Sequence, residues 1–554
     1  MAQGDTKKID SFLEKSKKEA EERDAQRRAD TSKTAYISLA LKPIETDALQ
    51  LIDEARARAA QVASVEKKSD KVVFVAFDTT TPETKKIIEE LQKQGFVLKI
   101  FTVSLVSLKR AWEFYKYVVR KNIEITDRID VDESRVKELM GKFKKLDVVK
   151  TEIENFDFKK FSTGQLVEIV IAGALQGRAS DIHFEPTREA VTLRYRIDGN
   201  LKEILTALKP IMYERIVSRI KLLSNLKLNI HDQAQDGRFT IRLGKKEIEM
   251  RVALAPSEFG EVIVMRVLDP DSINLSLADL GFRKDDLVII EKELERPNGM
   301  ILNTGPTGSG KTTTLYAFLK HKVSTEIKII TVEDPIEYHL KGIEQTQVKK
   351  EANYTFANGL RSIMRQDPDV ILIGEVRDKE TAEIAIQASL TGHLVFSTVH
   401  ANQAAGAIPR LVDLGVKPTS IGPALNLIIA QRLVRKLCQK CRVSIKNEKS
   451  AAIGKVLKNL PKRAGSVTVP ANIYGPKGCD ACGDSGYRGR IAVYELLRVS
   501  KEIEALMNKQ AGEIEIHDFA VNQGMVTMQQ DGLIKVFDGM TTVEEVEKTT
   551  GPLE

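Results

Sequence analysis

The chain has 554 residues, and at about 100 to 200 residues per domain it should hold three or four domains, which excludes a single small binding module. Apolar residues make up 42% and charged residues 29%, so the composition excludes a disordered chain. The 85 basic and 78 acidic side chains leave a net charge of only +7. This excess is too dilute to indicate a nucleic-acid binder, so we expect no specific nucleic-acid partner.

The first residues and the hydropathy of the chain bear on its location. The sequence contains no apolar run of about 18 residues, and its first ten residues lack the apolar core of a secretory signal. We therefore expect a cytoplasmic protein that does not span a membrane. Residues 1–34 are densely charged with almost no apolar stripe, which predicts a flexible, solvated arm that cannot dock strongly.

The residue composition and hydrophobic pattern divide the rest of the chain into four segments. Residues 35–125 alternate apolar runs with helical patterns and predict a small α/β domain. Residues 126–160 are polar and predict a linker with helical stretches. Residues 161–270 predict a second, α+β domain, and from 275 to 554 short apolar strands alternate with helices, as in a parallel sheet.

A phosphate-binding motif lies in the context that its function requires. The strand-like residues 300–302 run into GPTGSGKT at 305–312, and a helical pattern follows. Backbone N–H groups of this loop would surround a β-phosphate, Lys311 would reach the β and γ oxygens, and Thr312 would ligate Mg²⁺. The residues expected to bind ATP are Gly305, Pro306, Thr307, Gly308, Ser309, Gly310, Lys311, Thr312 and Thr313.

Three further segments repeat one layout, an apolar strand that ends in polar side chains. They are KIITVEDPIEY at 328–338, DVILIGEVRD at 369–378 and TGHLVFSTVH at 391–400. Because ligands bind at the carboxyl ends of parallel strands, we expect all three ends to face the phosphate loop. There Glu333 would orient the attacking water and Glu375 would organise Mg²⁺, although either alone could be a capping or surface carboxylate. His400, with His393 at the start of its strand, is either a buried histidine or a sensor of the γ-phosphate.

Two arginines extend this constellation. Arg361 and Arg365 stand four residues apart in GLRSIMRQDPD at 359–369, on one face of a predicted helix. Paired guanidinium groups suit a γ-phosphate or an acidic neighbour. The alternative is a solvated pair of arginines.

The cysteines form a second constellation. All four lie in two C-x₂-C pairs, Cys438 with Cys441 and Cys479 with Cys482. Each pair can offer two thiolates to one tetrahedral Zn²⁺, and four buried free thiols are the alternative. Because four thiolates leave no ligand position open, the metal is expected to be structural.

In this order the motifs resemble those of the type II secretion and type IV pilus assembly ATPases. The resemblance covers residues 160–500 and rests on ASDIHFEP (179–186), RIDG (196–199), AQDGRF (234–239), GPTGSGKTTTLY, TVEDPIEY, GLRSIMRQDPD, ILIGEVRDKETA, TGHLVFSTVHAN, QRLVRKLCQKC and CDACGDSGYRGR. It implies an α/β fold in which residues 275–554 form a RecA-like P-loop ATPase domain with a zinc-binding insertion at 438–482. Residues 35–125 resemble the first N-terminal domain of that family more weakly.

The resemblance also implies a function. It implies a hexameric, ATP-hydrolysing motor in which Glu333 is the catalytic base and Glu375 the Walker B carboxylate. Each ATP would lie between the RecA-like domain of one chain and the second N-terminal domain packed across it. The motor would act on a platform protein at the cytoplasmic face of the inner membrane, so its own membrane association would be peripheral and through partners. Its cycle would drive pilin-like subunits into a pilus or a secretion pseudopilus.

The second domain has no phosphate loop of its own but concentrates arginines, namely Arg194, Arg196, Arg219 and Arg238. In YERIVSRIKLL the apolar residues would face the core and leave Arg219 free, so we expect Arg219 to complete the γ-phosphate site of another chain. Ordinary surface ion pairs are the alternative.

Two other functions stay open, a nucleotide-gated assembly scaffold with little turnover and a related DNA-translocating ATPase. The presence of both Glu333 and Glu375 favours the motor over the scaffold. No basic, aromatic-rich stripe indicates a DNA channel. The sequence does not separate pilus assembly from protein secretion.

Overall fold

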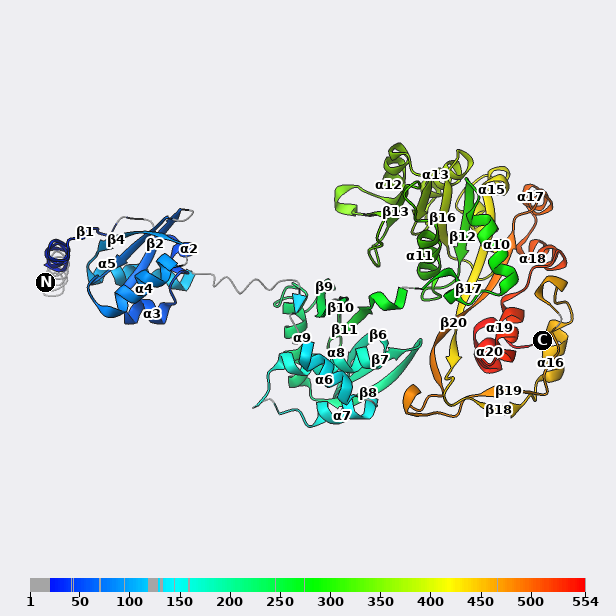
Figure 1. Cartoon of the computed structure of the whole chain (residues 1–554), viewed down its shortest axis with the longest axis horizontal. Coiled ribbons are helices and arrows are strands. Elements are labelled where there is room, and N and C mark those ends of the chain that lie inside the picture. The colour runs from blue at the N-terminus through cyan, green and yellow to red at the C-terminus, as the bar shows by residue number, and fades with distance from the viewer. Residues whose placement is uncertain are drawn as a thin grey trace, which may run out of the picture. The chain divides into compact units, whose positions relative to one another are not determined.

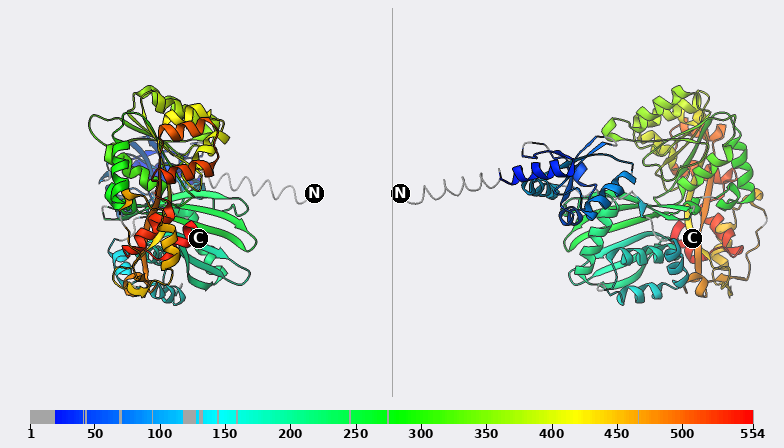
Figure 2. Two further views of the ribbon diagram at one scale, coloured as in Figure 1. Left: turned by 90° about the vertical axis from the view of Figure 1, so that its right-hand side faces the viewer. Right: turned by 60° about the vertical axis from the view of Figure 1, so that its left-hand side comes forward.

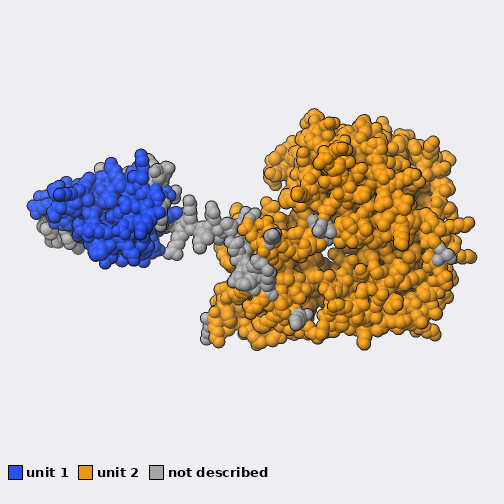
Figure 3. Space-filling view, viewed as in Figure 1, with its two compact units in different colours: residues 1–126 blue, residues 127–554 orange. Residues whose placement is uncertain are grey.

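The computed structural model describes residues 20–117, 128–129 and 133–553, apart from residues 41, 43, 69, 70, 94, 144, 158, 159, 245, 274 and 466. The chain divides into two compact units, residues 1–126 and 127–554, which Figure 3 colours separately. Within the described ranges, no helix combines the length and the apolar character that crossing a membrane requires.

The first unit is the small α/β domain that the sequence predicts. Its four-stranded sheet has the order β1-β4-β3-β2, in which β3 and β4 run parallel and β2 is antiparallel to β3. Buried residues of the strands and helices, such as Phe74 and Leu108, share one core. The elements are β1 (Ala35–Tyr36), α2 (Thr46–Leu49), α3 (Glu54–Ala59), β2 (Val62–Lys68), β3 (Lys71–Ala76), α4 (Pro82–Lys93), β4 (Val97–Thr102) and α5 (Leu105–Glu113).

The described end of the predicted arm differs from the expectation of a solvated segment. Residues 20–32 are helical, and Ala25 and Ala29 on this helix are buried. The guanidinium carbon of Arg28 lies 3.5 Å from the ring centre of Phe77, and Ser104 donates a hydrogen bond of 2.7 Å to Glu22. Two alanines one helical turn apart form an apolar stripe that is narrow but sufficient for contact, so residues 20–34 belong to the domain. Residues 1–19 of the predicted arm lie outside the described residues.

The second domain opens the second unit and is built on a seven-stranded sheet of order β5-β9-β10-β11-β6-β7-β8. Helices α8 and α9 pack on this sheet through one continuous apolar core, and Figure 1 shows them beside it. The elements are β5 (Arg128–Ile129), α6 (Glu133–Lys142), α7 (Leu146–Glu154), α8 (Thr163–Gln176), β6 (Ala179–Pro186), β7 (Val191–Ile197), β8 (Asn200–Leu208), α9 (Pro210–Leu223), β9 (Gln235–Leu243), β10 (Lys246–Ser257) and β11 (Gly260–Leu268).

The predicted linker is wrong for residues 133–154. Both α6 and α7 belong to the second domain, because Val136, Phe143, Val149 and Ile153 are buried in its core. This segment is rich in Lys, Asp and Glu, so its average composition is polar although these four positions are apolar. The second domain therefore begins before residue 161.

The C-terminal domain holds a seven-stranded sheet of order β14-β13-β15-β16-β12-β17-β20, in which only β20 is antiparallel to its neighbour. Its strands are β12 (Gly299–Thr304), β13 (Ile329–Glu333), β14 (Glu344–Gln347), β15 (Val370–Ile373), β16 (Leu394–Val399), β17 (Leu425–Leu437) and β20 (Tyr487–Arg498). Its helices are α10 (Lys284–Leu294), α11 (Lys311–Lys322), α12 (Phe356–Ile363), α13 (Lys379–Leu390), α14 (Ala407–Asp413), α15 (Pro418–Ala424), α17 (Lys501–Asn508), α18 (Glu513–Asn522), α19 (Met528–Phe537) and α20 (Val543–Thr550).

Helices cover both faces of this sheet, as the two views in Figure 2 show. Met300 and Leu302 of β12 pack with α12, α13 and α15 on one face, whereas Ile301 packs with α10 and α11 on the other. A strand buried on both faces is apolar at every position, which explains the unbroken apolar runs in the sequence. Because β12, β13, β15 and β16 are parallel neighbours, their carboxyl ends meet at one edge of the sheet.

The predicted zinc-binding insertion, residues 438–482, leaves the C-terminal domain between β17 and β20. It contains β18 (Val443–Lys446), α16 (Ser450–Leu457) and β19 (Asn472–Gly475), and β18 pairs antiparallel with β19. We call this segment the cysteine module. Ile453 and Ile473 of the module share a small core with Leu533 and Val546 of α19 and α20.

Candidate active site

The phosphate-loop motif joins β12 to α11, as the sequence predicts. Gly308 and Gly310 have φ values of 78° and 90°, which side chains with a Cβ rarely adopt. A Cβ on Gly305 would lie 2.5 Å from the carbonyl oxygen of Gln431, and one on Gly310 would lie 2.8 Å from the amide nitrogen of the same residue. The loop therefore lies directly against β17, and glycine is required by space as well as by conformation at 305 and 310, and by conformation alone at 308.

Lys311 begins α11 and folds back over the loop. Its Nζ donates hydrogen bonds to the carbonyl oxygens of Gly305 at 2.7 Å and Pro306 at 3.1 Å. Burial lowers the pKa of Lys311, and the charge of Glu375 opposes this shift. A partly buried ammonium group whose hydrogen bonds go to neutral carbonyl oxygens favours an anionic ligand such as a phosphate.

A groove of about 740 Å³ lies at the carboxyl edge of the sheet. Glu333 ends β13, Glu375 follows β15 and His400 follows β16, and all three line the groove together with residues 307–313. The predicted convergence of the three strand ends on the phosphate loop is therefore confirmed. Pockets for nucleotides and other small ligands typically have volumes of about 300 to 1,000 Å³, so the groove is large enough for a nucleoside triphosphate.

The charge of Glu375 acts on Lys311, and two more ionisable side chains lie beside Glu375. It forms an ion pair with Arg377, and its other carboxylate oxygen lies 3.6 Å from Nε2 of His400. The hydroxyl of Thr304 accepts from the backbone nitrogen of Ala401 at 2.8 Å and donates to its carbonyl at 3.0 Å. These two bonds fix the start of the loop that carries His400 beside the phosphate loop.

Glu333 is only 3% exposed, and its carboxylate accepts several hydrogen bonds. Thr331 donates at 2.6 Å and the amide of Gln345 at 3.0 Å to one oxygen, and the hydroxyl of Tyr316 donates to the other. These donors satisfy the polar oxygens of a carboxylate that is buried away from water. Sequence reasoning found Glu333 but missed Tyr316 and Gln345.

The second domain of the same chain forms the opposite wall of the groove. Arg196 and Arg266 line it, and both approach Asp181, at 3.5 Å and 3.1 Å. Arg490 of β20 also lines it, and burial lowers the pKa of Arg490. Sequence reasoning missed Arg266 and Arg490, although Arg490 lies in the GYRGR segment that carried the family resemblance. The wall that was expected from a second chain is present here within one chain.

Several predicted residues do not line the groove. Arg361 pairs with Glu380 of α13, which is the acidic neighbour that the sequence allowed. Arg365 is exposed in the turn that follows α12. His393 precedes β16 at the amino edge of the sheet, where its Nδ1 lies 3.1 Å from the carbonyl oxygen of Ala388, so a role for His393 at the γ-phosphate is wrong.

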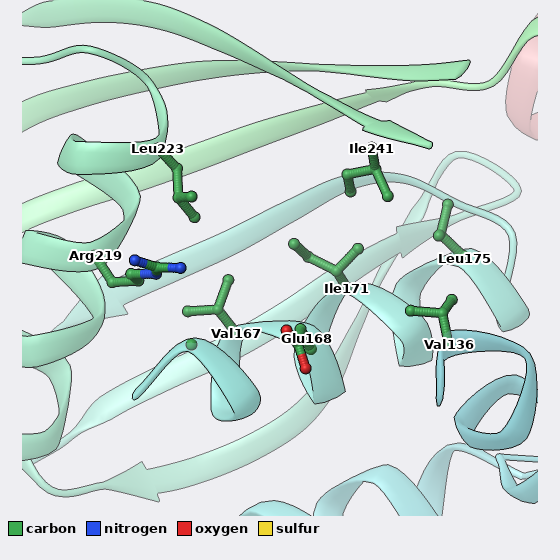
Figure 4. Close-up of a pocket in the computed structure, with 9 residues that line it drawn as sticks. Val136, Val167, Glu168, Ile171, Leu175, Arg219, Leu223 and Ile241 are labelled. Atoms are coloured by element: carbon green, nitrogen blue, oxygen red, sulfur yellow. The ribbon is translucent and has the colours of Figure 1, made fainter. Parts of the chain in front are cut away.

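Arg219 is not free, contrary to the expectation. Its side chain lies over α8, where a Cβ on Gly164 would be 3.5 Å from a guanidinium nitrogen. It lines a small, mostly apolar pocket inside the second domain with Val167, Ile171 and Leu223, as Figure 4 shows. The sequence of α9 alone does not reveal this contact with α8. In this chain Arg219 is therefore not part of the groove. The expected role of Arg219 at the site of another chain stays a prediction, because it concerns a contact between two chains.

The four cysteines converge as predicted. Their Sγ atoms all lie within 4.8 Å of one another, with Cys438 to Cys479 at 3.9 Å and Cys441 to Cys482 at 3.8 Å. Four sulfurs placed about 2.3 Å from a tetrahedral Zn²⁺ would be about 3.8 Å apart, so these thiols fit that ion. Backbone nitrogens of Cys479 and Gly486 donate to Sγ of Cys482 at 3.3 Å, which stabilises a thiolate.

Comparison with known proteins agrees with this geometry. The profile of the family described as type II/IV secretion system protein matches residues 159–548. The chain is 37% identical over 520 residues to the type IV pilus assembly ATPase PilB of Myxococcus xanthus, an alignment that covers 92% of this chain and 88% of that protein. It is 44% identical over 388 residues to the type II secretion system protein E of Dickeya dadantii, covering 70% of this chain and 75% of that protein.

The fold also matches a solved structure. The ATPase DotB of Yersinia pseudotuberculosis superimposes with a TM-score of 0.52 and 23% identity, over 70% of this chain and 94% of that one. At this identity the likeness shows the fold alone, and it supports the predicted RecA-like ATPase domain.

Proposed function

The chain belongs to the family of type II/IV secretion system proteins, and we propose that it is an ATP-hydrolysing motor that assembles a type IV pilus or a type II secretion pseudopilus. The observation that carries the proposal is the groove in which the phosphate loop, Glu333, Glu375 and His400 meet. A site that binds nucleotide without hydrolysing it needs only the phosphate loop. Carboxylates placed beside it suit hydrolysis.

ATP would be held by residues 305–313, with the triphosphate against the loop and the amino end of α11. The carbonyl oxygens that now accept from Lys311 would give way to phosphate oxygens, which bind an ammonium group more strongly because they are charged. Thr312 and Glu375 are oxygen donors of the type Mg²⁺ prefers, and the ion would supply charge neutralisation at the phosphates.

Hydrolysis requires a water molecule placed in line with the bond to be broken. Glu333 is a buried carboxylate that lines the groove, and in this proposal it would orient such a water and take up its proton. His400, joined to the site through Glu375, is placed to respond to a change in charge at the γ-phosphate. Arg196, Arg266 and Arg490 on the opposite walls would add positive charge near the phosphates.

The cysteine module would hold one Zn²⁺ through Cys438, Cys441, Cys479 and Cys482. With four thiolates bound, the ion has no open position, so its contribution would be to folding. Lys145 of the second domain pairs with Asp480 of the module at 2.7 Å, so a folded module would also support the domain that forms the groove wall.

Two comparisons bear on the kind of filament. The similarity to the pilus assembly ATPase extends over 92% of the chain, whereas that to the secretion protein covers 70% at a higher identity. The longer match supports pilus assembly as the first candidate and secretion as the second. In either case we propose that the chain works as a homo-hexamer on a platform protein at the cytoplasmic face of the inner membrane.

A genetic experiment tests this function. The gene is deleted and replaced by wild type, by Lys311→Ala or by the control Lys322→Ala, which removes the same charge from the opposite end of α11. We expect Lys311→Ala to abolish surface pili, counted by electron microscopy, while Lys322→Ala restores them. Loss of a secreted enzyme activity without loss of pili would assign the chain to secretion.

The two other functions predict different results. Normal pilus numbers and normal secretion with Lys311→Ala would contradict the motor and support a scaffold with little turnover. A defect confined to DNA uptake or transfer in the deletion strain would support the DNA-translocating ATPase. The assembly state is measured on the purified full-length chain by native mass spectrometry with Mg²⁺ and a non-hydrolysable ATP analogue, where six copies are expected.

A further inference from the structure

The carboxylate of Glu333 is linked to α11 by a buried hydrogen bond. Tyr316, on the second turn of α11, has no exposed surface, and its hydroxyl donates to Oε2 of Glu333. The same helix begins at Lys311 in the phosphate loop. Helix α11 therefore carries both Lys311 of the phosphate loop and Tyr316, which donates to the carboxylate of Glu333 on β13.

The ring of Tyr316 is fixed by its surroundings. It packs in the core between α11 and the sheet, with residues such as Leu319 and Ile329. Burial, together with the charge of Glu333 and the hydrogen bond to it, raises the pKa of Tyr316. The hydroxyl is therefore protonated throughout the physiological pH range and donates its proton to the carboxylate.

Gln345 holds the carboxylate from the other side. Its amide nitrogen donates to Oε1 of Glu333 at 3.0 Å and to the carbonyl of Tyr338 at 3.0 Å, and its oxygen accepts from the backbone of Leu340 at 2.6 Å. Every polar atom of this amide is thus engaged. The amide cannot rotate without breaking three bonds, so its position is determined by β14 and the loop before it.

The carboxylate of Glu333 has one hydrogen-bond position that these side chains leave open. A carboxylate has about four lone-pair sites, and Thr331, Gln345 and Tyr316 occupy three of them. One site is left for a fourth donor on the carboxylate. Among the described residues Tyr316 is the only side chain that donates to Oε2, so its hydroxyl determines which lone pair of that oxygen stays free.

We propose that Tyr316 is a positioning residue, whose hydroxyl orients Glu333 so that its free lone pair accepts a hydrogen bond from the attacking water. This inference rests on the proposed function, in which Glu333 acts on that water. It assigns to the tyrosine of GKTTTLY a part in hydrolysis rather than only in packing. Nucleotide binding, which depends on the loop, does not need this hydroxyl.

The test compares two tyrosines of the same core. Tyr316→Phe removes the hydroxyl and keeps the ring, and Tyr494→Phe does the same for a buried tyrosine that donates at 3.1 Å to the carbonyl of Leu280. Steady-state phosphate release is measured on the full-length chain with both variants, with Glu333→Gln and with the double variant of Tyr316→Phe and Glu333→Gln. Thermal melting and the affinity for ADP are measured in parallel.

We expect Tyr316→Phe to lower kcat by about 10- to 100-fold. This is the loss that is typical when a metal ligand loses the residue that hydrogen-bonds to it, which is a comparable positioning role. KM for ATP and the affinity for ADP should stay within about twofold. Tyr494→Phe should shift the melting temperature by a similar amount and leave kcat unchanged. The double variant should be no slower than Glu333→Gln alone, because the hydroxyl acts through that carboxylate.

Three outcomes would overturn the inference. If Tyr316→Phe keeps the wild-type kcat while Glu333→Gln is inactive, the proposed function stands and the positioning role is wrong. If both tyrosine variants lower kcat equally, the loss is structural and the positioning role is again wrong. If Glu333→Gln itself is fully active, the role of Glu333 in the proposed function is wrong, and the inference falls with it.

Discussion

The Nζ atom of Lys311 lies 2.7 Å from the carbonyl oxygen of Gly305, so the phosphate loop itself supplies acceptors for the lysine that should bind phosphate. These acceptors are uncharged, and burial lowers the pKa of the lysine. A phosphate at the loop would provide charged acceptors instead. Binding of a nucleotide should therefore be coupled to the protonation of Lys311.

This coupling predicts how nucleotide affinity depends on pH. Because the pKa of Lys311 lies below its ordinary value of 10.5, the free protein loses this proton at a lower pH than an exposed lysine would. A bound phosphate favours the charged form, so binding takes up a proton in that range. The affinity for ADP should be constant at lower pH and fall as pH rises through the lowered pKa.

The affinity is measured by fluorescence anisotropy of a labelled ADP between pH 7 and pH 10.5. Lys311→Ala, which cannot titrate at this position, is the control and should bind weakly with a flatter profile. An unchanged wild-type affinity up to pH 10.5 would contradict the coupling.

The cysteine module predicts a structural zinc ion. Four thiolates at tetrahedral spacing should hold about one Zn²⁺ per chain, measured by elemental analysis of protein purified without chelators. Cys479→Ser combined with Cys482→Ser should remove the metal and lower the melting temperature, because metal binding contributes to folding. The matched control is Asp484→Asn, which changes a residue of the same loop that is not a metal ligand.

Absence of zinc from the wild-type protein would contradict this assignment. Full thermal stability of the double cysteine variant would do so as well, since it would leave the metal without a structural effect.

The walls of the groove predict which arginines matter. Arg196 and Arg266 line the groove, whereas Arg219 lies against α8 and lines a separate small pocket of the second domain. Removing a cation near developing phosphate charge costs about 10²-fold or more in rate, so Arg196→Ala should lower kcat strongly. Arg219→Ala should alter stability more than kcat.

A mixing experiment tests whether the arginine acts within one chain. Arg196→Ala chains are combined with Lys311→Ala chains, and mixed oligomers are verified by native mass spectrometry. Since one chain supplies both walls here, neither chain in the mixture has a complete site, and no activity should return. Recovery of activity would show that the site is completed by a neighbouring chain.

Local patterns predicted much of the fold and the site. The strand, loop and helix around residues 300–322 form a contiguous motif, and the two cysteine pairs are readable from spacing alone. The convergence of Glu333, Glu375 and His400 followed from the rule that parallel strands end at one edge of a sheet. These features depend on neighbours in sequence or on a general property of parallel sheets.

Features that depend on distant contacts were missed or wrong. The contact of the Arg219 side chain depends on α8, and Gln345 reaches Glu333 only because β14 pairs with β13. Residues 20–32 and helix α7 dock through a few apolar positions within highly charged segments. In each of these cases the deciding partner lies elsewhere in the chain, where composition and periodicity carry no information about it.

Lys311, Glu333 and Glu375 are proposed to carry ATP hydrolysis in the groove. The most direct measurement is phosphate release by the purified full-length chain, compared with Lys311→Ala, Glu333→Gln and Glu375→Gln, together with ATP binding by each protein. We expect all three variants to lose at least about 10²-fold in rate, and Glu333→Gln to bind ATP still, because its phosphate loop is intact. Wild-type turnover by Glu333→Gln or by Lys311→Ala would contradict the account.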